Sequence, residues 1–222
     1  MSVRLAHLCD ILRYLANQRI HLYRLHARLV PAWAAADLAA WSRHLDDHRG
    51  LLRLVGALAE EADLRLTLHP YSDVILNTPD EERAVHSMGL LGAQHELLRA
   101  MELGPEAVIV LHTGGVYGDK ERASERFVRR YESLPEGVRA RLVLENDDRR
   151  FHLADVMRVH RRCGIPVVLD TLHHLVLNAE PLSLREALSG ALGTWPEHLI
   201  PKVHFSTPRT EMRQGKSGRI KV

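Results

Sequence analysis

Apolar and polar positions follow two alternating spacings along this chain. Between residues 4 and 16, leucine and isoleucine recur every three or four positions, as on the buried face of a helix. Short runs that are apolar throughout separate the segments of this kind, and such runs are typical of parallel strands covered by helices on both faces. The predicted order is helix 4–16, strand 20–25, helix 37–61, strand 64–68, helix 79–103, strand 107–112, helix 119–133, strand 141–145, helix 152–162, strand 166–170, helix 183–191 and strand 199–204.

Two helix boundaries have signals of their own. Thr78 and Pro79 predict a helix start, because threonine can cap the first turn and proline needs no amide partner there. Gly164, placed after a helical stretch, predicts a helix end, because glycine adopts the left-handed conformation that closes many helices.

Alternating helices and strands predict an α/β protein, either a barrel or a doubly wound open sheet. The first strand is not followed by GxGxxG, and polar residues follow the ends of five different strands, which favours the barrel. A closed barrel of this type has eight strands and the pattern gives about six. We therefore predict an incomplete TIM-type (β/α) barrel, with one domain at 1–204 and a basic tail at 205–222.

The composition restricts the class of protein further. The 222 residues are 45% hydrophobic, enough for one sizeable core, and the apolar runs are too short or too interrupted by charge to span a membrane. The N-terminus lacks the pattern of a signal peptide, so we expect a cytoplasmic protein, most simply a monomer. The net charge of +2 permits nucleic-acid binding without requiring it.

Histidines and acids gather where the predicted strands end. A buried carboxylate is costly without a cation, a metal or a strong donor beside it. The residues at these strand ends are His69, His112, Glu145, Asp170, His173, His174 and His204. Mixed imidazole and carboxylate ligands suit manganese, zinc or iron. Several such ions in one pocket point to hydrolysis of a phosphate ester, because they generate hydroxide at neutral pH and neutralise phosphoryl charge.

The glycines of "HTGGVYGDK" allow two interpretations. They would let a loop approach a bound phosphate closely, or they serve a strand-to-helix turn that needs positive φ.

Segments spread over nearly the whole chain resemble the UV damage endonuclease family in order and approximate spacing. They are "YRLHARLVP", "TLHP", "VLHTGGVYGDK", "RLVLENDD", "IPVVLDTLHH" and "KVHFS". The resemblance implies a TIM barrel with a cluster of divalent metal ions, typically Mn2+, with Zn2+, Co2+ and Mg2+ as alternatives. It also implies nicking of damaged double-stranded DNA immediately 5′ to UV photoproducts by metal-activated hydroxide.

The resemblance also implies roles for individual residues. The metal ligands fall on His69, His112, Glu145, Asp170, His173 and His204. Glu145 and Lys202 take the catalytic positions, and Lys202 matches a lysine that lies close to the metals and can be modified in relatives. The expected DNA contacts are Arg24, Tyr71, Ser72 and Lys120.

Departures from the family pattern keep other functions open. Tyr71, Ser72 and Asp73 stand where the family often has a Gln-Tyr pair that probes DNA, and a further histidine and a final-strand glutamate are not found. One alternative is a catalytically impaired or inactive DNA-binding fragment of the family. Another is a different metal-dependent TIM-barrel enzyme, such as an apurinic-site endonuclease or a sugar isomerase.

Overall fold

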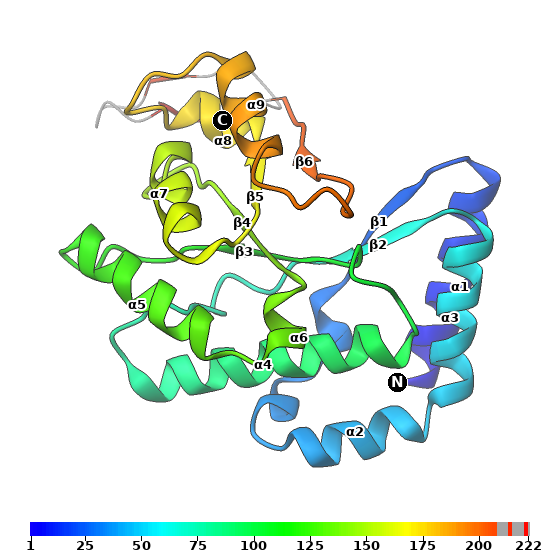
Figure 1. Ribbon diagram of the computed structural model, residues 1–222. Helices are drawn as coiled ribbons and strands as arrows, with labels where there is room; N and C mark the ends of the chain where they lie inside the picture. The colour runs from blue at the N-terminus through cyan, green and yellow to red at the C-terminus, as the bar shows by residue number, and fades with distance from the viewer. Residues whose placement is uncertain (208–212, 215–219, 222) are drawn as a thin grey trace. The chain divides into compact units, whose positions relative to one another are not determined.

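The computed structural model describes residues 1–207, 213–214 and 220–221 (Figure 1). Its contacts divide the chain into two compact units. The first unit comprises Met1–Ile75, Asp80–Val110 and Leu134–Leu142, and the second comprises Leu76–Pro79, Leu111–Ser133 and Val143–Val222. The predicted tail at 205–222 lies mostly outside the described residues, and the single domain at 1–204 stays a prediction.

Six strands follow one another in the sheet in the order in which they occur in the chain. They are β1 (Leu22–Leu25), β2 (Arg65–Leu68), β3 (Ile109–His112), β4 (Leu142–Glu145), β5 (Val167–Asp170) and β6 (Val203–His204). Each registered pair in this sheet is parallel, for example β1 with β2 and β5 with β6. Parallel strands that neighbour each other in chain order, joined through helices, are the arrangement of a (β/α) barrel, so the prediction of an incomplete barrel is confirmed. A separate antiparallel pair joins β7 (Arg213–Gln214) and β8 (Ile220–Lys221).

The helical segments of the first unit bury a mostly aliphatic core that includes Trp41. They are α1 (Ser2–Asn17), η1 (Ala27–Leu29), η2 (Ala32–Ala35), α2 (Leu38–Asp46), α3 (Arg49–Glu61), α4 (Glu81–Ala100) and α6 (Glu136–Arg139). The leucines that recur along α1 are buried, and α1 packs against α3. Trp41 of α2 is fully buried and donates from Nε1 to the carbonyl of Ala93 at 2.9 Å, which attaches α2 to α4.

Two boundaries in this unit differ from the prediction. The single helix expected at 37–61 is divided into α2 and α3, because the His48 side chain bonds the carbonyl of His44 at 2.8 Å and the His48 amide turns to Leu45 instead. The helix expected from Thr78 and Pro79 begins at Glu81, because Asp80 caps it by accepting from the Arg83 amide at 3.0 Å.

The second unit contains α5 (Lys120–Ser133), α7 (Leu153–Cys163), α8 (Thr171–Val176) and α9 (Leu184–Leu192). Gly164 ends α7 at a φ of 74°, as predicted. The short helix α8 was not predicted, because the polar residues of "DTLHH" show no helical spacing of apolar positions. Trp195 donates to the carbonyl of Val167 at 2.7 Å and attaches the segment after α9 to β5. Over the described part of the chain, no helix is both long and apolar enough to cross a bilayer.

Half-buried His95 gives the first unit a stability that depends on pH. Burial lowers the pKa of this imidazole, and the nearby Arg141 guanidinium lowers the pKa further. The unfolded chain therefore takes up a proton near pH 6.5 while the folded chain does not, so the free energy of unfolding falls as the pH drops below about 6.5. We expect the His95→Gln variant to lose part of this decrease in urea unfolding at pH 7.5 and 5.5. The exposed His7→Gln variant is the control, and equal pH dependence in both variants would contradict this account.

Candidate metal centre

Four strand ends and one short helix supply the polar groups of the candidate centre in the second unit. His112 is the last residue of β3, Glu145 of β4, Asp170 of β5 and His204 of β6. Asp170 and His204 are direct partners in the register of β5 and β6. His173 lies in the first turn of α8, which starts immediately after Asp170. Because parallel strands place their carboxyl ends at one edge, the sequence brings these five side chains to the same side of the sheet.

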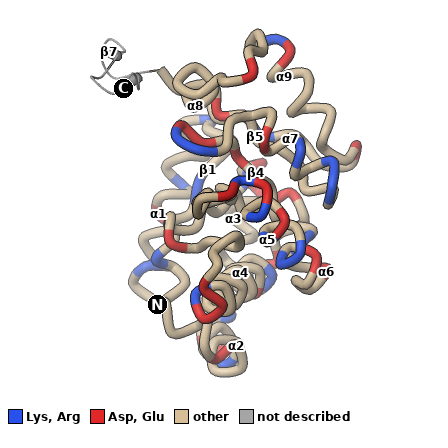
Figure 2. Tube along the Cα trace, turned by 90° about the vertical axis from the view of Figure 1, so that its left-hand side faces the viewer, with Lys and Arg blue, Asp and Glu red and all other residues tan. Residues whose placement is uncertain are grey.

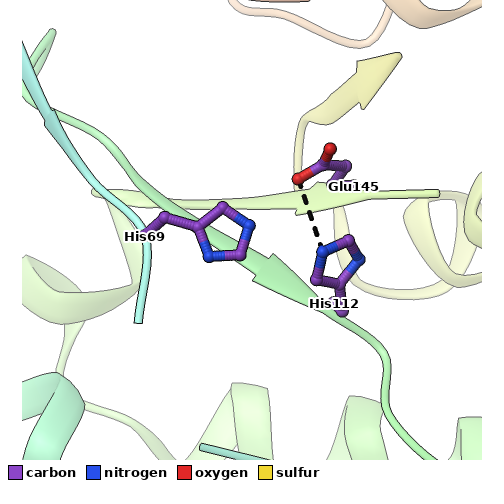
Figure 3. A group of neighbouring side chains, drawn as sticks. All are labelled: His69, His112 and Glu145. Atoms are coloured by element: carbon purple, nitrogen blue, oxygen red, sulfur yellow. Dashed lines mark ion pairs between the residues drawn. The ribbon is translucent and has the colours of Figure 1, made fainter. Parts of the chain in front are cut away.

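The Glu145 carboxylate lies among three imidazoles. It is 2% exposed, and its Oε1 accepts from His204 Nδ1 at 2.7 Å. Oε1 also lies 3.7 Å from His173 Nδ1, and Oε2 lies 3.6 Å from His112 Nε2. Figure 3 shows the His112 imidazole facing this carboxylate; the third side chain drawn there, His69, belongs to the first unit.

The donor set fits a divalent cation. Glu145, Asp170 and His204 each offer one ligand atom, and these atoms lie within 4.8 Å of one another. Both carboxylates are buried, with Asp170 at 7% exposure, so two negative charges share a space largely removed from water. Such a pair needs positive charge beside it. Nitrogen and oxygen ligands together are those that manganese, zinc and iron accept.

Asn146 holds Asp170 and His173 in place. Fully buried, it donates from Nδ2 to the Asp170 carbonyl at 3.1 Å and accepts from the Asp170 amide at 2.8 Å. The backbone carbonyl of Asn146 accepts from His173 Nδ1 at 2.9 Å. A carbonyl can only accept, so the proton of the neutral imidazole sits on Nδ1 and Nε2 keeps the lone pair that a metal would use. Sequence reasoning missed this residue, although it stands inside "LENDD".

Two other residues, His69 and Lys202, were predicted for the centre. His69 follows β2 in the first unit, is half-buried, and has Nδ1 3.0 Å from the carbonyl of Pro70. Lys202 is 4% exposed and stands two residues before His204. A role for His69 as a ligand, and for Lys202 in catalysis, stays a prediction.

The predicted DNA contacts are Arg24, Tyr71, Ser72 and Lys120, and the first three are exposed. The Tyr71 hydroxyl accepts from Arg28 Nε at 2.9 Å, which orients the ring at the surface of the first unit. Lys120 Nζ lies 2.7 Å from the buried carboxylate of Asp155, so α5 and α7 share an ion pair in the second unit. None of these contacts tests DNA binding.

The glycine-rich loop after β3 contains the turn that one interpretation expected. Gly114 and Gly118 have φ values of 110° and 79°, which residues other than glycine rarely adopt. Asn77 donates to the Gly115 carbonyl at 2.7 Å and fixes the middle of the loop. The turn therefore accounts for Gly114 and Gly118 without a phosphate.

The family model described as UV-endonuclease UvdE matches residues 2–220. The chain belongs to this family. Relatives named UV DNA damage endonuclease occur in Clostridium perfringens, 31% identical over 199 residues, and in Bacillus cereus strain B4264, 33% identical over 213 residues. These matches cover 88% and 93% of this chain but 48% and 65% of the relatives, so the chain spans about half to two thirds of their length.

Solved structures agree with the UvdE assignment. The crystal structure of SacUVDE is 31% identical, has a TM-score of 0.86, and matches 97% of this chain and 72% of its own. The 3-keto-D-glucoside 4-epimerase YcjR from E. coli has a TM-score of 0.63 at 17% identity, with 95% of this chain and 77% of its own covered. At that identity, the epimerase supports only the fold.

Proposed function

We propose that this UvdE-family chain is a metal-dependent DNA repair endonuclease that nicks the phosphodiester 5′ to UV photoproducts in double-stranded DNA. The observation that carries the proposal is the buried Glu145 carboxylate, surrounded by imidazoles from three other segments in a chain whose UvdE match spans residues 2–220. The relatives named UV DNA damage endonuclease support the same reaction and substrate.

The residues proposed to hold the metal cluster are His69, His112, Glu145, Asp170, His173 and His204. Manganese is the proposed ion, with zinc, cobalt and magnesium as alternatives. When bound, the ions would supply hydroxide at neutral pH and neutralise charge on the phosphate. Glu145 would hold the ions together with His112 and His204, whose imidazoles approach its two oxygens. The Asn146 carbonyl fixes the His173 ring with Nε2 available to an ion.

Other side chains would position the substrate. Lys202 is buried and stands two residues before His204. We propose that its ammonium group binds the phosphate of the substrate, or that a modified Lys202 serves as a further metal ligand. Arg24, Tyr71, Ser72 and Lys120 are proposed to contact DNA, with the cations on phosphate and the Tyr71 ring on a base. Figure 2 shows lysine and arginine interspersed with acids along the chain, in keeping with the net charge of +2, so local rather than overall charge would hold the DNA.

We also propose that the protein acts as a cytoplasmic monomer.

Removal of metal tests this function. We expect the protein to convert UV-irradiated supercoiled plasmid to the nicked form with Mn2+ present, to stop when EDTA is added in excess, and to recover when Mn2+ is restored, because the carboxylates and imidazoles of the centre need the ion for hydrolysis. Gel electrophoresis measures the fraction nicked, and unirradiated plasmid is the control. Binding of irradiated DNA without nicking would support the inactive fragment, and turnover of sugars alone would support an isomerase.

A further inference from the structure

The loop that follows β4 is closed on itself between Asp147 and Phe151. The Asp147 amide donates to the Phe151 carbonyl at 2.9 Å, and the Phe151 amide donates to Asp147 Oδ2 at 3.1 Å. Asp147 Oδ1 also accepts from the amides of Arg149 and Arg150 at 2.7 and 2.6 Å. One carboxylate therefore holds three successive amides, and the fully buried Phe151 side chain anchors the end of the loop.

This loop begins close to the candidate metal centre, within the same unit. Arg150 stands five residues after Glu145, the last residue of β4. Five residues of fully extended chain span at most about 18 Å, which limits the separation of the two Cα atoms. The phosphates of one DNA strand follow one another every roughly 3.4 Å along the helix axis. The loop can therefore reach phosphates within about five nucleotides of a bond that is cut at the centre.

Two guanidinium groups extend from this fixed backbone into solvent. Arg149 and Arg150 are both exposed. Arg149 Nε lies 3.6 Å from Asp148 Oδ2 in an exposed pair, and Arg150 has no ion-pair partner in the part of the chain that the structure describes. The Asp147 carboxylate already accepts from three amides, which leaves little of its acceptor capacity for a guanidinium group. Phosphate suits such groups, because arginine donates two parallel hydrogen bonds to it and an ordered loop loses little entropy on binding.

We propose that residues 147–151 form a binding site for the phosphate backbone of DNA, in which Arg149 and Arg150 contact phosphates and Asp147 positions them. The inference rests on the proposed function, which supplies the DNA. Contacts to phosphate fix the register of a protein on the duplex and carry no sequence information. This site therefore holds the duplex over the metal centre and leaves recognition of the lesion to other residues.

The salt dependence of DNA binding tests the two arginines. Fluorescence anisotropy measures the affinity for a labelled duplex with one UV photoproduct and for the undamaged duplex, in EDTA so that no strand is cut. We expect the Arg149→Gln/Arg150→Gln variant to bind both duplexes about tenfold more weakly, or weaker still, at about 0.1 M salt. The slope of log affinity against log salt should become shallower by about 2, because each phosphate contact releases roughly one counterion.

The matched control removes the same charge from another part of the second unit. Arg129 and Arg161 are exposed and lie in later turns of α5 and α7, away from the strand ends that carry the centre. The Arg129→Gln/Arg161→Gln variant should keep the slope and the affinity of the unchanged protein. An equal loss in the two double variants would overturn the site, because overall charge would then explain both.

Two neighbouring acids separate positioning from simple electrostatics. Asp147→Ala and Asp148→Ala each remove one negative charge, but only Asp147 accepts from the loop amides. We expect Asp148→Ala to bind DNA at least as tightly as the unchanged protein, and Asp147→Ala to bind about fivefold more weakly despite its lost negative charge. Asp147→Asn keeps one acceptor oxygen and should lie between, and urea unfolding identifies any variant that has not folded. Tighter binding by folded Asp147→Ala would overturn the positioning role.

Duplexes with neutral methylphosphonates within five nucleotides of the photoproduct test the location. They should weaken binding by the unchanged protein about tenfold more than binding by the Arg149→Gln/Arg150→Gln variant. Equal weakening in both proteins would place the arginine contacts elsewhere and overturn the inference. Nicking of irradiated plasmid by the unchanged protein is measured separately. A protein that nicks but shows no effect of the two arginines fails this inference alone, and one that shows the effect without nicking fails the proposed function.

Discussion

We expect the Glu145→Gln variant to nick UV-irradiated DNA at least about a thousandfold more slowly than the unchanged protein, since a metal centre contributes several kcal/mol to the transition state. Glutamine keeps the shape of the side chain but loses the negative charge that lies 2.7 Å from His204 and 3.6 Å from His112. Single-turnover nicking with Mn2+ gives the rate, and elemental analysis of dialysed protein gives the bound metal.

The exposed Glu197→Gln variant is the control for this substitution and should keep both its rate and its metal content. Circular dichroism should show the Glu145→Gln variant folded, because glutamine keeps the shape of the side chain and removes one of two neighbouring buried carboxylates. A folded Glu145→Gln protein with the full nicking rate would refute the assignment of Glu145 to the centre.

The second large effect is expected at Asn146. The Asn146→Leu variant should lose about 2–4 kcal/mol of unfolding free energy, because the buried amide and carbonyl of Asp170 would both lose their partner. Its affinity for Mn2+ should fall about 10-fold to 100-fold, the usual cost of removing a group that orients ligands. Urea unfolding gives the stability, and a metal titration followed by calorimetry gives the affinity.

Asn17→Leu is the matched control, because Asn17 is exposed at the end of α1 and should leave both quantities unchanged. If the Asn146→Leu protein loses stability but binds Mn2+ as before, Asn146 supports the fold and does not position the ligands.

The sequence by itself determined the order of strands and helices and the residues at the strand ends. Apolar runs such as "LVL" before Glu145 and "VVL" before Asp170 are buried strands, and the polar residue that ends each run lies at the same edge of the sheet. Gly164 ends α7 because glycine can adopt a positive φ, and this property depends on a single residue. These features depend on neighbours in the chain, and a single sequence records them directly.

Only the tertiary structure decided which atoms meet. The two bonds between Asn146 and Asp170 join strand ends that are 24 residues apart, and no spacing rule predicts them. The division at His48 depends on one side chain competing for a carbonyl of the helix, where the apolar pattern continues unbroken. A pocket of about 290 Å³ beside α4 is lined by segments that lie between Arg4 and Gln94 in the sequence, and it forms only when these segments pack together. Local patterns place each residue on an element, whereas contacts between distant elements depend on the packing of the whole core.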